Sequence, residues 1–205
     1  GGGGEAEASY PVDSRFSAIS EAVSAELQDK GAERGAWAVF QDGAIVHAEG
    51  FGGAGPDTLF RIGSVTKALT ALRVLQQTGE EAYGLDSTLA ALDDGFSMDL
   101  SPERDHLVTV GDLLKHTGGF VDLAEIQGPL EDSSLGDFVQ GDLASRMFII
   151  GPPGAFFNYS NTNYVLAGHA VEQGAGGFYR EQMEQNVFSP LGMERTFFLG
   201  DRVEE

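Results

Sequence analysis

The stretch FRIGSVTKALTALRVLQQTGE, residues 60–80, carries both a helical pattern and an uncommon pair of polar side chains. Apolar residues recur at helical spacing on more than one face, which predicts a central, buried helix over residues 64–77. Lys67, one of only three lysines in the chain, stands three residues after Ser64. Because residues at i and i+3 share a helix face, the hydroxyl and the amine are expected side by side at the start of this helix.

This Ser64–Lys67 pair has a chemical and a plain interpretation. A serine hydroxyl is a poor nucleophile and needs a base beside it, which a buried lysine can provide. The free N–H groups at a helix N-terminus also stabilise an anion that develops there. The plain interpretation is a helix-capping serine beside a solvated lysine. The apolar sequence around Lys67, with no acidic residue nearby, favours the first, because a buried lysine is costly without a partner or a function.

A second motif lies in FFNYSNTNYVLAG, residues 156–168. Tyr159 and Asn161 stand in a predicted turn just before a helix. A tyrosine beside a lysine can share a proton with it, and an asparagine amide can both donate to and accept from a substrate amide. The alternative is a polar turn in which Asn161 or Thr162 caps the helix. The presence of both motifs, in this order, favours the chemical interpretation of each.

The rest of the pattern predicts strands only at the front of the chain. Residues 14–29 have one apolar helical face, and Asp42-Gly43 suits a two-residue hairpin turn between β-prone runs. The predicted strands cover residues 36–41 and 44–49, and the predicted later helices cover residues 110–116, 162–174 and 178–188. Residues 1–13, which begin GGGGEAEASYP, are expected to form a flexible tail or linker, followed by one domain over residues 14–205.

Composition narrows the classes of partner and site. The 205-residue chain carries 32 acidic against 12 basic residues, a formal charge of −20, so nucleic acid is not an expected partner. Acid spread along the whole chain is similar to the pattern in proteins of salt-loving organisms. No apolar run is long enough for a membrane-spanning helix. The absence of cysteine excludes disulfides and thiolate metal sites, and no histidine stands at a metal-ligand spacing such as His-Glu-x-x-His.

Two further expectations concern the histidines and the compartment. His47, His106, His116 and His169 receive ordinary structural interpretations: a strand, a loop, a helix end and an apolar helix. A Ser-His-Asp triad stays open as an alternative, although no Gly-x-Ser-x-Gly turn is present. The N-terminus is not an intact signal peptide, so the chain is expected to be either cytoplasmic or exported with a leader removed.

Four stretches, in order, resemble the serine β-lactamase and penicillin-binding-protein superfamily, and most of all the class C β-lactamases and their esterase-like relatives. They are TLFRIGSVTKALTALRVLQ, LVTVGDLLKHTGGF, PPGAFFNYSNTNYVLAGHAVE and VFSPLGMERTFF. The resemblance implies Ser64 as the acylated nucleophile, Lys67 and Tyr159 as the proton-transfer pair, and Asn161 as a substrate-positioning residue. It implies no cofactor and no metal.

The chain departs from this family in two places. The family usually has His-Thr-Ser-Gly where this chain has His116-Thr117-Gly118-Gly119. The family also continues well past PLGMERTFF, with further strands of the sheet and a Lys-Thr-Gly or His-x-Gly strand that supplies one of two oxyanion-hole N–H groups. Neither triplet occurs here. The chain is therefore expected to be incomplete at its C-terminus, or to be completed by a missing segment or a second chain.

The fold class expected from these observations is α/β (α+β) and β-lactamase/transpeptidase-like. It comprises an N-terminal helix and β-hairpin and a mostly helical region, without the C-terminal strands. The expected function is acyl transfer by a serine hydrolase on a small-molecule substrate: a β-lactam, a D-alanyl peptide or a small ester. The alternative is a non-catalytic, truncated homologue that serves as a binding or structural module, or as a subunit completed by another chain.

Overall fold

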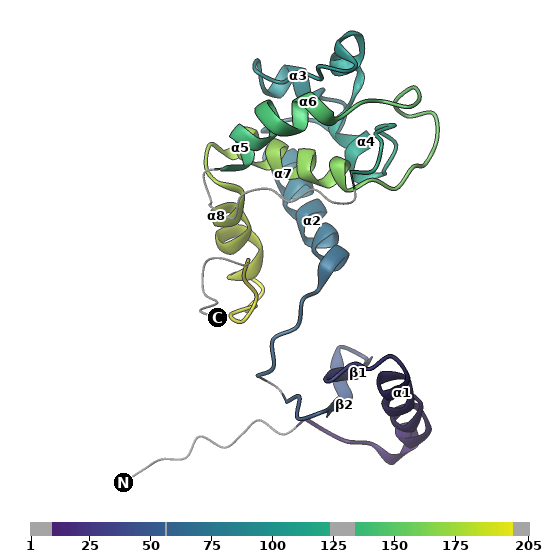
Figure 1. The fold of residues 1–205 in the computed structure, drawn as a ribbon. Coiled ribbons are helices and arrows are strands. Elements are labelled where there is room, and N and C mark those ends of the chain that lie inside the picture. The colour runs from purple at the N-terminus through teal and green to yellow at the C-terminus, as the bar shows by residue number, and fades with distance from the viewer. Residues whose placement is uncertain (1–9, 56, 124–133, 199–205) are drawn as a thin grey trace. The chain divides into compact units, whose positions relative to one another are not determined.

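The computed structural model describes residues 10–55, 57–123 and 134–198, and its chain divides into two compact units, Gly1–Arg61 and Ile62–Glu205. Figure 1 shows a small helix-and-hairpin unit and a larger helical unit. The mixed, mostly helical fold with its strands at the front confirms the predicted fold class. The predicted single domain over residues 14–205 stays a prediction.

The first unit is a helix packed on a two-stranded antiparallel sheet. A 3₁₀ turn (η1, Ser14–Phe16) leads into α1 (Ser17–Asp29), and β1 (Gly35–Gln41) pairs with β2 (Ala44–Phe51). Asp42 and Gly43, at φ 52° and 80°, form the left-handed turn that the sequence predicted. An aromatic cluster holds the helix end to the sheet: the ring of Trp37 lies 4.5 Å from His47 and 6.1 Å from Phe16.

The last residues of the predicted tail contact this sheet. The Ala48 N–H donates to the carbonyl of Pro11 at 2.9 Å, and the Asp13 N–H donates to Nδ1 of His47 at 3.0 Å. Residues 10–13 thus lie along β2, while residues 1–9 lie outside the described part of the chain. By accepting the hydrogen bond from the Asp13 N–H, the buried His47 ring also fixes the segment that leads into α1.

The second unit is built around one long helix. α7 (Asn161–Ala175) packs against α2 (Thr66–Gly79), α4 (Val110–Leu114) and α8 (Tyr179–Met183). In Figure 1 the α7 helix lies beside α2, with α4 and α8 toward its two ends. The remaining elements are η2 (Gly63–Val65), α3 (Leu89–Leu92), η3 (Pro102–Leu107), α5 (Ser134–Phe138), η4 (Val139–Leu143), α6 (Ala144–Arg146) and η5 (Glu184–Phe188).

Two of the helices continue through a π-helical turn. The π turn η4 joins α5 to α6, and the π turn η5 extends α8 to Phe188. The predicted helix over residues 178–188 is therefore present, although its second half is not α-helical. The predicted helix over residues 110–116 ends earlier, at Leu114, because His116 adopts φ 55° and cannot continue it.

The core of the second unit is apolar and centred on α7. Leu166, Ala167, Ala170 and Val171 are fully buried there, together with Val74 of α2. By transfer bookkeeping, each fully buried Leu or Val contributes about 1.5–3 kcal/mol. The same cluster includes Val110 and Leu113 of α4, Phe120 of the loop that follows, Leu143 of η4 and Met147 directly after α6.

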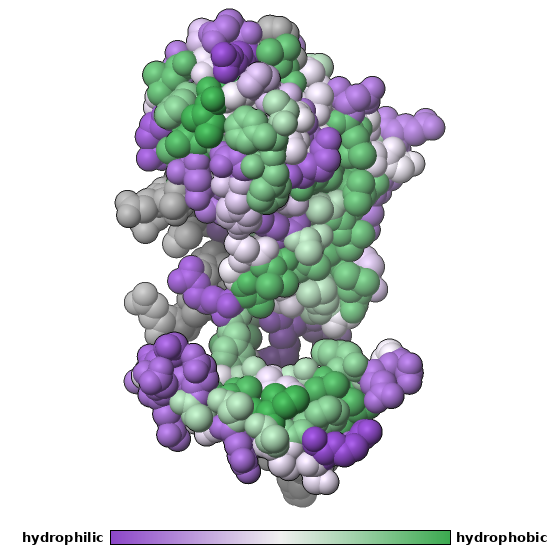
Figure 2. Space-filling model, turned by 90° about the vertical axis from the view of Figure 1, so that its right-hand side faces the viewer, coloured by the Kyte–Doolittle hydropathy of each residue, from purple (hydrophilic) through white to green (hydrophobic). Residues whose placement is uncertain are grey.

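The prediction that α2 is buried on most sides is wrong. Its buried positions are Thr70, Arg73, Val74 and Gln77, and three of these are polar. Leu72 and Leu75 keep 38% and 49% of their surface exposed. Apolar surface is visible on both units in Figure 2, where it appears green. The apolar periodicity of this helix therefore identified the element correctly but not its buried face.

The helices of the described residues fall short of the requirements of a membrane span. Within residues 10–55, 57–123 and 134–198, no helix combines the length and the apolar character that a membrane span requires.

Candidate active site

Ser64 stands where a loop turns into helix α2. Gly63 has φ 50°, a conformation that favours glycine, and directly precedes Ser64 in the 3₁₀ turn η2. This turn runs into α2 without a break, so the exposed Ser64 side chain lies at the helix N-terminus. The helix dipole and the N–H groups of this first turn favour a negative charge at that position.

Lys67 lies one turn further on and contacts two polar groups. Its Nζ donates to Ser64 Oγ at 3.0 Å and to Asn161 Oδ1 at 2.8 Å. The same Nζ lies 5.1 Å from the ring centre of Tyr159 and 5.7 Å from that of Tyr164, within cation–π range. The half-buried lysine therefore has polar and aromatic partners, which the apolar sequence around it had led us to expect.

Tyr159 lies in the segment before α7, and Asn161 is the first residue of that helix. Ser160 caps this helix: its Oγ accepts from the Thr162 N–H at 3.2 Å and donates to the carbonyl of Val121 at 3.0 Å. The backbone N–H of Asn161 donates to Asp122 at 2.9 Å. The predicted alternative of Asn161 or Thr162 as the cap is wrong, and the Asn161 side chain is left to face Lys67.

The hydroxyl of Tyr159 meets Ser64 directly. Ser64 Oγ and Tyr159 Oη lie 2.8 Å apart, and either can donate. The Lys67 amine and the Ser64 hydroxyl both stabilise the phenolate, and together they hold the pKa of Tyr159 below its ordinary value of 10.0. The structure thus brings together all four side chains that the sequence singled out, with two potential proton acceptors or donors on one serine oxygen.

One contact of this group has no counterpart in the sequence expectations. The imidazole of His116 stacks on the ring of Tyr159, with 4.4 Å between ring centres and 28° between planes. The sequence treated His116 as an ordinary helix-end residue. The signal that could have found it is its place in LLKHTGG, a stretch of the family resemblance that carried no assigned chemistry.

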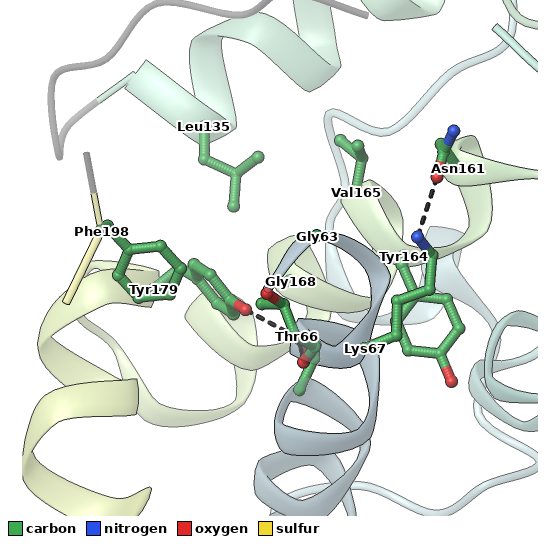
Figure 3. Close-up of a pocket in the computed structure, with 11 residues that line it drawn as sticks. Gly63, Thr66, Lys67, Leu135, Asn161, Tyr164, Val165, Gly168, Tyr179 and Phe198 are labelled. Carbon is green, nitrogen blue, oxygen red and sulfur yellow. Dashed lines mark hydrogen bonds between the residues drawn. The ribbon is translucent and has the colours of Figure 1, made fainter. Parts of the chain in front are cut away.

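A cavity of about 380 Å³ opens beside these residues, between α2, α7 and α8. Lys67 and Asn161 stand at one side of it and point toward each other in Figure 3. A hydrogen bond of 2.7 Å between Thr70 Oγ1 and the buried Tyr179 hydroxyl lines another side. Most of the remaining lining is apolar: Leu135, Val165, Gly168 and Phe198.

The two other histidines whose side chains are described have partners of their own. His47 belongs to the first unit, and His169 is buried in α7, where Nε2 lies 2.7 Å from Asp93 Oδ2. A histidine base for Ser64 is thus not supported by its described hydrogen bonds, which come from Lys67 and Tyr159. The side chain of His106 lies outside the described residues. Among those described, no group of three histidine or acidic side chains is placed to hold a metal ion.

The chain matches the family model described as Beta-lactamase over residues 19–205. It is 30% identical over 143 residues to penicillin-binding protein 4 of Amycolatopsis lactamdurans, covering 70% of this chain and 37% of that protein. It is 27% identical over 200 residues to D-aminopeptidase of Gluconobacter oxydans (strain 621H), covering 91% of this chain and 36% of that enzyme. The chain thus spans little more than a third of the length of either relative.

The chain is also similar to solved structures of penicillin-binding-protein-like and amidohydrolase proteins. The octameric penicillin-binding protein homologue from Pyrococcus abyssi is 26% identical at a TM-score of 0.73, over 87% of this chain and 43% of that one. SurE in complex with D-Leu is 29% identical at a TM-score of 0.66, covering 88% and 41%. A D-stereospecific amidohydrolase from Streptomyces sp. is 30% identical at a TM-score of 0.59, covering 71% and 46%.

Proposed function

Because the chain belongs to the Beta-lactamase family of serine hydrolases, we propose that Ser64 is the nucleophile of an acyl-transfer reaction. The observation that carries this proposal is the convergence of two side chains on one oxygen: Lys67 Nζ at 3.0 Å and Tyr159 Oη at 2.8 Å from Ser64 Oγ. A serine oxygen flanked in this way can lose its proton as it attacks a carbonyl carbon.

In the proposed reaction Tyr159 takes the proton. Its phenolate form is stabilised by Lys67 and Ser64, which is why its pKa lies below the ordinary value. Ser64 Oγ bonds to the substrate carbonyl, and the proton passes from Ser64 to Tyr159 and then to the leaving amine or alkoxide. The acyl-enzyme forms as the leaving group departs. Water then attacks the ester carbon, and Tyr159 takes a proton from that water. Tyr159 passes this proton to Ser64 Oγ as the ester bond breaks and the acid product departs.

In this scheme Lys67 provides electrostatic stabilisation and Asn161 binds the substrate. Lys67 Nζ donates to Ser64 Oγ and lies over the Tyr159 ring, where it favours the phenolate form of Tyr159. Since Asn161 Oδ1 accepts from Lys67 at 2.8 Å, its NH₂ group is left to donate to a substrate carbonyl. The Ser64 N–H is one proposed oxyanion donor. The second donor, from a further segment or another chain, stays a prediction of the family resemblance.

We propose an amide or ester beside a D-configured residue as the substrate class. The names of three relatives support this choice: a D-aminopeptidase, a D-stereospecific amidohydrolase and SurE, which was solved with D-Leu. β-Lactams and small esters are the other two classes that the sequence allowed. A cavity with apolar lining next to Lys67 and Asn161 offers room for a side chain of such a substrate.

Intact-mass measurement after incubation with a fluorophosphonate tests the reaction class. One adduct is expected, absent in Ser64→Ala and retained in Ser145→Ala, an exposed serine in α6. Lys67→Met should abolish labelling, whereas Lys115→Met should not, because Lys115 is two-thirds exposed and lies 3.8 Å from Asp112. A folded protein that takes no adduct in low or molar salt supports the non-catalytic alternative instead.

Paired substrates test the substrate class. D-Alanine and L-alanine p-nitroanilide, benzylpenicillin and p-nitrophenyl acetate should be compared under identical conditions. Preferential turnover of the D-anilide, lost in Ser64→Ala, is the expected result. A persistent penicillin adduct without turnover of the anilides assigns the site to β-lactams, and turnover of the acetate alone assigns it to esters.

A further inference from the structure

His116 occupies a conformation that few residues adopt. Its φ of 55° lies in the left-handed region, where histidine, asparagine and aspartate are the commonest residues after glycine. The conformation turns the chain out of α4 and directs the imidazole against Tyr159, on which it stacks at 4.4 Å. His116 is 8% exposed, so its side of the stack is buried, whereas Tyr159 on the other side is exposed.

The same residue also fixes the backbone on both sides of Tyr159. The Asn158 N–H donates to the His116 carbonyl at 2.8 Å, and the Ser160 N–H donates to His116 Nδ1 at 3.3 Å. Ser160 is fully buried, so its N–H has no water to replace that acceptor. One carbonyl and one side chain of His116 therefore hold the backbone N–H groups of the residues before and after Tyr159, while the ring face holds the phenol itself.

The acceptor role requires His116 to be neutral with its proton on Nε2. The groups that face the ring are Lys67 of α2, Asp122 of the following loop and the phenols of Tyr159 and Tyr164. Burial and the positive charge of Lys67 lower the pKa of His116, against the opposite effects of the Ser160 hydrogen bond and Asp122. The site thus favours the form of the ring that can accept from Ser160.

We propose that His116 is the positioning residue of this site, which holds the Tyr159 hydroxyl at hydrogen-bonding distance from Ser64. The proposal deepens the acyl-transfer function and rests on it for its kinetic consequence. His116 itself need not contact substrate. It acts through Tyr159, whose exposed side chain also contacts Ser64 and Lys67.

Two substitutions separate the two contributions. His116→Asn keeps a residue that tolerates positive φ and places Oδ1 where Nδ1 was, so it removes only the stack. His116→Phe keeps a ring against Tyr159 but leaves the Ser160 N–H without an acceptor. A displacement near 1 Å in a reacting group can lower a rate about 100-fold. We expect fluorophosphonate labelling of Ser64 to fall about 10-fold in His116→Asn and about 100-fold in His116→Phe.

The pKa of the Tyr159 phenol, read by NMR of ¹³C-labelled tyrosine, distinguishes positioning from general stability. When Tyr159 moves away from Ser64 and Lys67, its pKa should rise toward 10.0, and the pH profile of labelling should shift to higher pH with it. Phe157→Leu is the matched control: Phe157 also contacts His116, ring to ring at 5.9 Å, but does not lie between His116 and Tyr159's partners. It should change neither readout.

The outcomes separate this proposal from the proposed function. Variants that label more slowly while the Tyr159 pKa and the pH profile stay at their wild-type values would show a merely structural role and overturn it. Unchanged labelling in both variants overturns it as well. If the wild-type protein takes no label, the acyl-transfer function fails, yet the pKa of Tyr159 in His116→Asn still decides whether His116 positions the phenol.

Discussion

Lys67 Nζ lies 2.8 Å from Asn161 Oδ1, although 94 positions separate the two residues in the chain. Each belongs to the first turn of its helix, α2 and α7, and the two helices pack together along the core. The hydrogen bond engages the amide oxygen of Asn161, leaves its NH₂ group to donate, and holds the lysine beside Ser64. The first turns of α2 and α7 therefore contribute to one polar site. The role proposed for Lys67 depends on Asn161, and the role proposed for Asn161 depends on Lys67.

Replacement of Asn161 should therefore weaken Ser64 reactivity. Asn161→Ala removes the acceptor of a charged donor, a contact worth about 1.5–3 kcal/mol, so labelling should slow about 10- to 100-fold. Asn161→Asp retains an acceptor for Lys67 but loses the donor proposed for substrate. It should be labelled by the small fluorophosphonate faster than Asn161→Ala, yet turn over the D-anilide no better. Stopped-flow labelling and anilide turnover measure the two effects, and identical losses in both variants would contradict this division.

Tyr159→Phe should remove the proton acceptor without unfolding the protein. General base catalysis contributes about 10²–10⁴ in rate, and the labelling rate should fall within that range. Tyr159 is 42% exposed, so the free energy of unfolding should change by no more than about 0.5 kcal/mol.

The pH dependence of labelling follows from the same residue. Because the pKa of Tyr159 is lowered, the phenolate increases as pH rises through a value below 10.0, and the rate should rise and then level off before that pH. In Tyr159→Phe this limb should be absent. A rate in the wild-type protein that still climbs steeply through pH 10 would argue against Tyr159 as the acceptor.

The buried pair of His169 and Asp93 should stabilise the fold over a defined pH range. Burial opposes the charge of His169, but Glu172 and Asp93 outweigh it and raise its pKa above 6.5, so its contribution is complete below pH 6.5 and lost as pH rises through the raised value. Burial likewise opposes the charge of Asp93, yet its hydrogen bonds with Gln140, His169 and Gly95 lower its pKa below 3.8. That contribution is complete above pH 3.8 and lost on further acidification.

Asp93→Asn should therefore destabilise most between pH 3.8 and 6.5. Removing one partner of a buried pair costs about 3 kcal/mol, measured as the free energy of unfolding in urea at pH 5. The difference from wild type should shrink above pH 8. Asp142→Asn is the matched control: it breaks an exposed pair with Arg146 and should cost less than about 1 kcal/mol. A loss in Asp93→Asn that is the same at pH 5 and pH 9 would contradict the charged pair.

Gly118 stands where the family usually has serine. A side chain at this position would contact two buried residues. An added Cβ would lie 2.6 Å from Asn163 Oδ1 and 2.8 Å from Phe120 Cε2, both of them buried. Gly118→Ala should thus cost about 1–3 kcal/mol through overpacking. Asn163 Oδ1 has no hydrogen-bond donor among the described residues.

Gly118→Ser should consequently be milder than Gly118→Ala. Its hydroxyl can donate to Asn163 Oδ1, which should recover about 1 kcal/mol relative to alanine. Urea unfolding of the two variants side by side gives the difference directly. An alanine variant as stable as the serine variant would show that the orphaned acceptor carries no cost.

The strongly acidic composition makes a prediction of its own. At a formal charge of −20, self-repulsion should destabilise the fold at low ionic strength, and about 1 M salt shortens the screening length to roughly 3 Å. The melting temperature should rise from low to molar KCl. A flat or falling melting temperature over that range would count against the salt-adapted interpretation.

Local signals predicted the elements well because their causes are local. Asp42-Gly43 fixes the hairpin turn through its own backbone preferences, and Thr109 with Asp112 forms a capping box that starts α4. The Ser64–Lys67 contact was also predictable, since i and i+3 residues of a helix adjoin whatever surrounds them. These features need no knowledge of the rest of the fold.

The features that the sequence did not predict depend on packing between distant segments. The stack of His116 on Tyr159 requires both the left-handed turn after α4 and the docking of the α7 turn against it. The buried face of α2 is the one that packs against α7 and α8. It carries Arg73 and Gln77 rather than Leu72 and Leu75. Periodicity counts apolar residues on a helix, whereas burial depends on what lies opposite.

The separation of Ser64 and Tyr159 by 95 positions also has a kinetic consequence. A site closed over so long a loop forms only after the loop-closure entropy of docking α2 against α7 has been overcome, which is a slow, non-local step. Secondary structure should return earlier on dilution from denaturant, since it needs only neighbours along the chain. The time at which Ser64 becomes reactive during refolding would then report when α2 and α7 dock against each other.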